Sequence, residues 1–281
     1  MIKDFSRRRR ALAGAGMAVL IPFAPLVWAA APARGTEAGH AAEGGSEALP
    51  LPSAINKSGR QRMLTQRLGK AWAMQALGVE PELAAKIRKQ SEALFVSQLG
   101  ELQKATPAPE IAAAATALAQ AWESYRDNLA LAPGKENAAR VYTSGDEALQ
   151  RAQELTALYE KRLGTPQGRL VNIAGRQRML SERMARAFYF VRFGDIGNAA
   201  KDLATAHKEF DAGLQELLNA PRNTPSIKQE LALAGQQWIF FRAAIDGKIQ
   251  GASADKSVAT TSERILEQLN VVVAKYEALQ G

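Results

Sequence analysis

A segment of 13 residues occurs twice in this chain, and it constrains the fold more than any other feature. Residues 55–67 read INKSGRQRMLTQR, and residues 171–183 read VNIAGRQRMLSER. When the windows are extended to 55–72 and 171–188, they share 9 identical positions out of 18. Agreement of this kind indicates an internal duplication, so one structural unit is expected to occur twice.

The spacing of apolar residues predicts helices from residue 53 onward. One stripe has apolar positions 4, 3, 4, 3 and 4 residues apart, which places them on one face of a helix: Ile111, Ala115, Leu118, Trp122, Tyr125 and Leu129. Only 6% of the residues are aromatic, Ala is abundant, and no run rich in Val and Ile suggests a strand. Each copy holds four helical segments joined by short loops, which is typical of an up-and-down four-helix bundle.

The predicted helices follow the same order in both copies. In the first copy they cover 53–77, 81–104, a segment after Pro109 that reaches 129, and 135–163; in the second they cover 170–193, 195–219, 225–249 and 255–280. We therefore predict an all-α fold of two tandem four-helix bundles, residues 53–164 and 168–281. Trp122 and Trp238 occupy equivalent positions in the two copies and are predicted to be core residues.

Residues 1–33 have the pattern of an export signal. Basic residues 7–10 precede an apolar run from Ala11 to Val27, and small residues follow. The arginine pair resembles a twin-arginine signal, with a general secretory signal as the alternative. We expect export to the periplasm, or else anchoring in the inner membrane by an uncleaved segment. Residues 34–52, rich in Gly, Ala and Glu, are predicted to be a flexible linker.

Charge and composition exclude several classes of function. The formal net charge is +8, but residues 1–33 hold five of the basic side chains, and the rest of the chain has 31 basic against 27 acidic residues. Without a basic face interleaved with aromatic residues, nucleic acid is not an expected partner. The chain has no Cys and two histidines, His40 and His207. We therefore expect no metal site, no cofactor, no catalytic residues and no enzyme activity.

One face of each repeated helix consists of very small residues apart from one arginine and one Gln or Glu. These candidate site residues are Gly59, Arg62 and Gln66 in the first copy and Gly175, Arg178 and Glu182 in the second. A face of small residues allows a neighbouring helix to come close, so Arg62 and Arg178 are expected to be buried in that contact. A buried guanidinium group needs a partner. Helical spacing leaves two alternatives open: a small planar oxyanion between the two arginines, or ion pairs with carboxylates of other helices.

Four other arginines of the repeated segment fall on a different face. Arg60, Arg67, Arg176 and Arg183 are expected to be solvated or to form salt bridges between helices.

The pattern Asn-x-x-Gly-Arg-Gln-Arg-Met-Leu-Ser-x-Arg-Met, which both copies follow closely, resembles the signature helix of the PilJ-type domain. That domain is the N-terminal periplasmic module of type IV pili methyl-accepting chemotaxis transducers, and it is related to the NarX-type nitrate/nitrite sensor domains. The resemblance implies a four-helix sensor module in which Arg62 and Arg178 hold one anion, nitrate or nitrite first. The site would lie within one chain or within a homodimer.

The chain also departs from this family. Residue 66 is Gln whereas residue 182 is Glu, and a carboxylate beside Arg178 would weaken anion binding. No transmembrane or output segment is recognisable after the second copy, so we expect a membrane-bound signalling partner. The alternative is a structural or protein-interaction module whose arginines form internal ion pairs.

Overall fold

Proline and glycine mark most of the helix ends in the computed structural model, which describes residues 49–194 and 196–279. The first copy folds into α1 (Leu51–Leu77), α2 (Pro81–Lys104), α3 (Pro109–Leu129) and α4 (Lys135–Leu163). The second folds into α5 (Pro166–Val191), a short 3-10 turn η1 (Ile196–Asn198), α6 (Ala199–Leu218), α7 (Pro225–Ile245) and α8 (Gly251–Glu277). The described residues contain no strand, which confirms the all-α prediction.

Several helix ends differ from the predicted ones. Helix α5 begins at Pro166 and not at residue 170, because the Thr165 side chain caps the helix and Pro166 suits its first turn. Helix α6 begins at Ala199 and not at residue 195, because Gly197 and Asn198 have positive φ angles of 66° and 62°. Helix α7 ends at Ile245, four residues before its predicted end, and Gly247 follows it with a φ of 76°. Helix α8 begins four residues before its predicted start.

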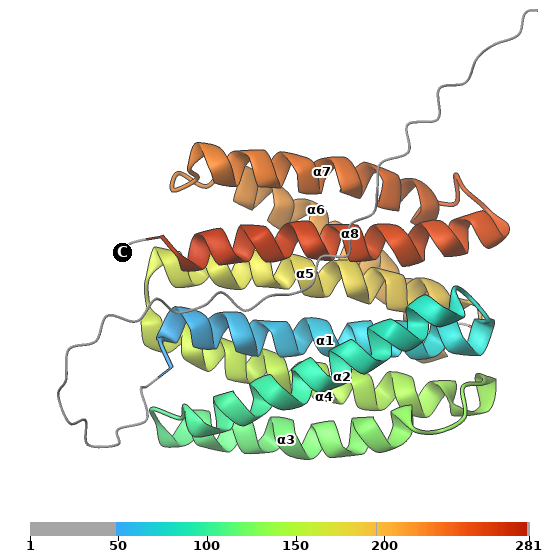
Figure 1. Ribbon diagram of the computed structural model, residues 1–281, viewed down its shortest axis with the longest axis horizontal. Helices are drawn as coiled ribbons and strands as arrows, with labels where there is room; N and C mark the ends of the chain where they lie inside the picture. Colours follow the sequence, from blue (N-terminus) through green and yellow to red (C-terminus); the bar gives the residue numbers. More distant parts are fainter. Residues whose placement is uncertain (1–48, 195, 280–281) are drawn as a thin grey trace, which may run out of the picture. The chain divides into compact units, whose positions relative to one another are not determined.

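The two signature helices, α1 and α5, lie side by side and form the centre of the fold (Figure 1). Helix α1 also packs against α2 and α4, and α3 completes the first bundle by packing on α4. The second copy repeats these pairings, since α5 packs against α6 and α8 while α7 packs on α8. The described residues belong to one unit, and the division predicted between residues 164 and 168 stays a prediction.

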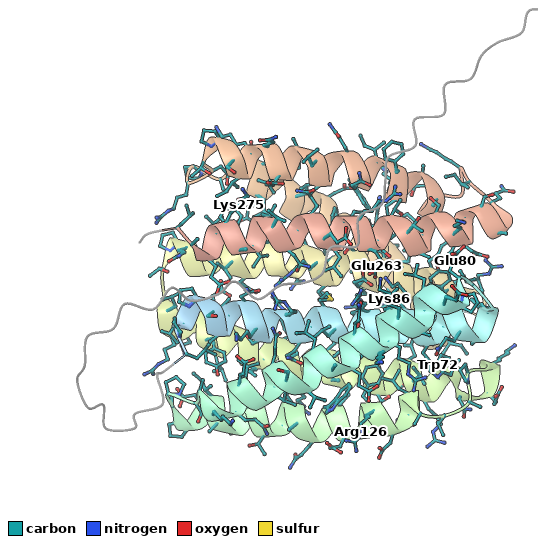
Figure 2. All side chains as sticks on the ribbon, viewed as in Figure 1. Trp72, Glu80, Lys86, Arg126, Glu263 and Lys275 are labelled. Carbon is teal, nitrogen blue, oxygen red and sulfur yellow. The ribbon has the colours of Figure 1, made fainter. Side chains whose placement is uncertain are left out.

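A single apolar core runs through both copies. Near the ends of the signature helices, Trp72 of α1 stacks against Phe190 of α5 with ring centroids 6.1 Å apart, and Figure 2 labels Trp72 there. The predicted core residues Trp122 and Trp238 are confirmed, being 3% and 5% exposed. Truncating a buried Trp to Ala costs about 3–5 kcal/mol, so each is a major source of stability for its bundle.

None of the described helices is both long enough and apolar enough to cross a membrane. The predicted export signal at residues 1–33 and nearly all of the predicted linker at 34–52 lie outside the described residues.

Candidate functional site

The side chains of Arg62 and Arg178 are both 0% exposed and cross the contact between α1 and α5 in opposite directions. The Nη2 atom of Arg62 donates a hydrogen bond to Oδ1 of Asn172 on α5, at 2.7 Å. The Nη2 atom of Arg178 donates to Oδ1 of Asn56 on α1, at 3.0 Å. Each copy therefore supplies the arginine for one bond and the asparagine for the other, a two-fold arrangement within one chain.

The last helix of each copy provides a further amide. The Nη1 atom of Arg62 donates to Oε1 of Gln153 on α4, at 2.7 Å. In the second copy, Nη1 of Arg178 donates to Oδ1 of Asn270 on α8, at 2.9 Å. The two guanidinium groups thus have neutral amide partners in matching positions.

No carboxylate forms an ion pair with Arg62 or Arg178 in the described part of the chain. Their Nε atoms are buried and have no hydrogen-bond partner among the described residues. The alternative in which these arginines form ion pairs with carboxylates of other helices therefore finds no support among the described residues. Two buried guanidinium groups lie in one helix contact without a carboxylate partner among the described residues, which is an expensive arrangement.

The Nη2 atoms of both arginines lie close to Gly175, at the same point of the contact between α1 and α5. A Cβ atom added at Gly175 would lie 3.5 Å from Nη2 of Arg62 and 3.4 Å from Nη2 of Arg178. At Gly59 a Cβ atom would lie 3.1 Å from Nη2 of Arg62, which is closer than side chains usually tolerate. The structure thus brings four of the predicted site residues together: Gly59, Arg62, Gly175 and Arg178.

The electrostatic environment disfavours the charged form of both guanidinium groups. Burial, with a further contribution from Arg176, lowers the pKa of Arg62 to about 9. Burial, together with the positive charges of Arg60 and Arg62, holds the pKa of Arg178 well below its usual range. An anion in this place would relieve both effects, because it would supply the missing negative charge.

The other two predicted site residues, Gln66 and Glu182, lie in a second cluster. Gln66 accepts a hydrogen bond from Nη1 of Arg186, at 2.8 Å. Glu182 forms an ion pair of 2.7 Å with Lys70, and both side chains are 0% exposed. The negative charge of Glu182 is thus paired with Lys70, and Glu182 forms no ion pair with Arg178.

Carboxylates compensate the cations of this second cluster. Asp146 accepts from Nη1 of Arg186 at 2.7 Å. Glu263, which Figure 2 labels, accepts from Lys70 at 2.6 Å. The Glu263 carboxylate also accepts from Nε of Arg67, at 3.0 Å. Although burial opposes its ionisation, Lys70 and Arg67 outweigh burial and lower the pKa of Glu263 to about 2. The second cluster is therefore neutralised by the chain itself.

Three of the four remaining signature arginines form the predicted salt bridges. Arg67 pairs with Glu263, Arg176 pairs with Glu209 and Arg183 pairs with Asp202. Arg60 has no ion pair among the described residues, and burial lowers its pKa.

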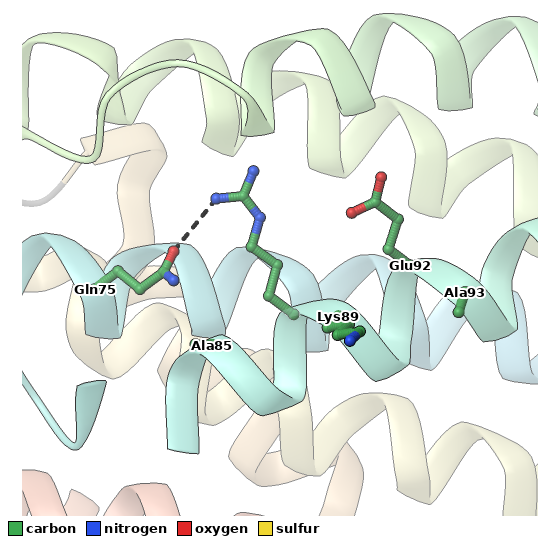
Figure 3. Close-up of a pocket in the computed structure, with 6 residues that line it drawn as sticks. Gln75, Ala85, Lys89, Glu92 and Ala93 are labelled. Atoms are coloured by element: carbon green, nitrogen blue, oxygen red, sulfur yellow. Dashed lines mark hydrogen bonds between the residues drawn. The ribbon is translucent and has the colours of Figure 1, made fainter. Parts of the chain in front are cut away.

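A surface groove of about 420 Å³ lies elsewhere, along α2 (Figure 3). It is lined by Gln75, Ala85, Arg88, Lys89, Glu92 and Ala93. Arg88 is already engaged, because its Nη2 atom donates to the carbonyl of Leu129 at 2.7 Å and its Nη1 atom donates to Gln75 at 3.3 Å. The described residues contain no cluster of side chains suited to a metal ion.

Asn56 and Asn172 are site residues that helical spacing does not reveal. Their only signal in the sequence is that Asn is the first identical position of the repeated segment. Asn56 donates a hydrogen bond to Glu277 near the end of α8. Asn172 donates one to Glu160, the equivalent acidic residue near the end of α4. A pattern on one helix cannot identify these partners, because they come from other helices.

Comparison with protein families gave one match. The model for the type IV pili methyl-accepting chemotaxis transducer N-terminal domain (PilJ) matches residues 47–153 and residues 164–263. Both copies of the signature helix lie within the matched residues. Comparisons with curated proteins and with solved structures gave no match.

Proposed function

We propose that this chain, which belongs to the family of PilJ-type N-terminal domains of type IV pili methyl-accepting chemotaxis transducers, is a sensor-like helical module that binds a small oxyanion between Arg62 and Arg178. The observation that carries this proposal is the pair of buried guanidinium groups whose only hydrogen-bond partners among the described residues are oxygens of amide side chains and of the backbone. Arginine presents five N–H donors in a planar fork that suits planar oxyanions.

Nitrate or nitrite is the first candidate ligand. The resemblance of the signature helix to the NarX-type sensor domains motivates this choice. A small monovalent anion also suits a site that two adjacent helices enclose, because a larger ligand would have to separate α1 from α5. Because each arginine meets an asparagine of the other copy, we place the site within one chain, with one anion per chain.

The signalling role follows from the family. We propose that the module is exported to the periplasm and presents its anion-bound state to a membrane-bound partner. Binding between α1 and α5 would act on the contact between the two copies, since these helices join them. A change in that contact is a physical means by which occupancy could alter the outer helices.

Calorimetric titration and thermal melting of the purified protein with nitrate, nitrite and chloride test the proposal. We expect saturable binding of one oxyanion per chain, and at 100 times the Kd a stabilisation of about 2.7 kcal/mol. Replacing Arg62 by Gln should abolish this stabilisation and leave the ligand-free protein folded, because one of two repelling charges is removed. Arg183→Gln is the matched control, since Arg183 also lies on α5 but pairs with Asp202. Absence of heat and of any melting shift with every anion would refute the proposal.

A further inference from the structure

An asparagine separates each buried arginine from a carboxylate. The Nδ2 atom of Asn56, which accepts from Arg178 through Oδ1, donates to Oε2 of Glu277 at 2.6 Å. The other copy contains the same chain of contacts, in which Asn172 accepts from Arg62 and donates to Glu160. The order Arg, Asn, Glu therefore occurs twice.

The fold is able to place carboxylates directly on buried cations. It does so in the second cluster, where Glu182 contacts Lys70 and Asp146 contacts Arg186. All these residues lie on the same helices that build the anion site, namely α1, α4 and α5. Among the described residues, an amide separates arginine from carboxylate in this way only at Arg62 and Arg178.

Because an amide lies between them, each carboxylate acts on the charge of its arginine without contacting the guanidinium group. At this distance the charge of Glu160 still acts to raise the pKa of Arg62, and that of Glu277 acts to raise the pKa of Arg178, in each case against the larger effect of burial. The carboxylate does not occupy the guanidinium edge, however, so it reduces the cost of burying the cation without becoming its counterion.

The carboxylate also fixes the direction of the amide. A carboxylate only accepts hydrogen bonds, so it must face the Nδ2 group of the asparagine. The Oδ1 atom is then turned toward arginine, as observed at both positions. Glu160 and Glu277 thereby orient the amides that hold the two guanidinium groups.

We propose that Asn56 and Asn172 are positioning residues that hold Arg62 and Arg178 in place while keeping them free of a counterion, so that the site is open to an added anion. This inference rests on the proposed function. The inference predicts the effect of exchanging the two groups, so that the carboxylate stands at the Asn position and the amide at the Glu position. The exchange should prevent anion binding while the hydrogen bonds that link the three residues remain.

The double variant Asn56→Asp/Glu277→Gln makes this change and conserves net charge. Its aspartate can accept from Arg178 through one oxygen and from the new glutamine amide through the other. The matched control is Glu277→Gln alone, which keeps Asn56 and whose glutamine oxygen can still accept from Nδ2 of Asn56. Nitrate affinity and the nitrate-induced melting shift are measured for the wild type, the control and the double variant. The corresponding pair in the other copy, Asn172→Asp/Glu160→Gln, provides a second test should the first variant fail to fold.

We expect the double variant to melt at or above the wild-type temperature and to bind nitrate at least about tenfold more weakly than the control, because a carboxylate at position 56 would occupy the edge of the Arg178 guanidinium group and repel the nitrate ion. Equal affinities in the double variant and the control would overturn this inference alone, with the anion site intact. Absence of nitrate binding by the wild type would instead overturn the proposed function, and this inference with it.

Discussion

Asn56 and Asn172 occupy equivalent positions of the two copies, and each accepts a hydrogen bond from the signature arginine of the other copy. A duplicated helix has thus produced a two-fold site inside one chain. A single-copy module could form such a site only by pairing two chains. The duplication also allows the halves to diverge, as Gln66 and Glu182 have done outside the arginine pair.

Gly175→Ala should fill the place between the arginines. The added methyl group would meet both Nη2 atoms at ordinary contact distance, and Ala is favoured over Gly within a helix by about 1 kcal/mol. We expect the ligand-free variant to be at least as stable as the wild type but to lose nitrate-dependent stabilisation in thermal melting. Gly235→Ala in α7, where nothing lies within 4 Å of the added carbon, is the control and should keep the nitrate effect. Normal nitrate affinity in the Gly175→Ala variant would mean that the anion binds elsewhere in the protein.

Glu182→Gln should leave anion binding unchanged. Glu182 belongs to the second cluster, where it pairs with Lys70, and it forms no ion pair with Arg178. We expect nitrate affinity within about twofold of the wild type, since Glu263 still pairs with Lys70 and compensates its charge in the variant. The measurement is a calorimetric titration of the variant and of the wild type with nitrate. A large change in affinity would mean that the two clusters act as one.

Glu263→Gln should reduce stability in a pH-dependent way. Lys70 and Arg67 lower the pKa of Glu263 to about 2, below its unfolded value of about 4.3. The carboxylate therefore contributes stability that is full above about pH 4.3 and is lost as the pH falls through about 2. Removing one partner of a buried ion pair costs about 3–5 kcal/mol, so we expect a loss of that order at pH 7.

Denaturant unfolding of the wild type and of Glu263→Gln between pH 7 and pH 2 measures this effect. The difference between the two free energies of unfolding should shrink steadily below about pH 4.3. Glu209→Gln is the control, because Glu209 is 39% exposed and pairs with Arg176 near the surface. A difference for Glu263→Gln that does not change with pH would contradict the assigned shift in pKa.

Nitrate affinity should not depend on protein concentration. Both arginines and both asparagines of the site come from one chain, so no association of chains is needed to complete it. Titrations at protein concentrations that differ by a factor of about 100, with the oligomeric state followed by light scattering, test this point. An affinity that rises with dimer formation would favour a site shared between two chains.

The sequence predicts the fold well because helical periodicity and helix ends are local properties. The stripe that contains Trp122 and the equivalence of the two copies can both be recognised along the chain. The predicted helix ends differ from the observed ones where capping decides the end, as at Thr165. They also differ where residues with positive φ interrupt the helix, as at Gly197 and Asn198. Such details depend on single backbone conformations that apolar spacing does not encode.

The candidate site was predictable only in part. Spacing on one helix identified Arg62 and Arg178 as buried, since they lie on faces of small residues. It grouped Gln66 and Glu182 with them because all share a face, whereas contacts from other helices draw these two toward Arg186 and Lys70. The asparagine partners come from the opposite copy, so only the packing of α1 against α5 reveals them.

A crystal structure of the protein grown with a saturating concentration of nitrate tests the central claim most directly. The account predicts planar density for one nitrate ion in each chain, between α1 and α5, within hydrogen-bond distance of both Arg62 and Arg178. Well-ordered arginines that keep only their amide and backbone partners, with no anion between them at saturating nitrate, would contradict it.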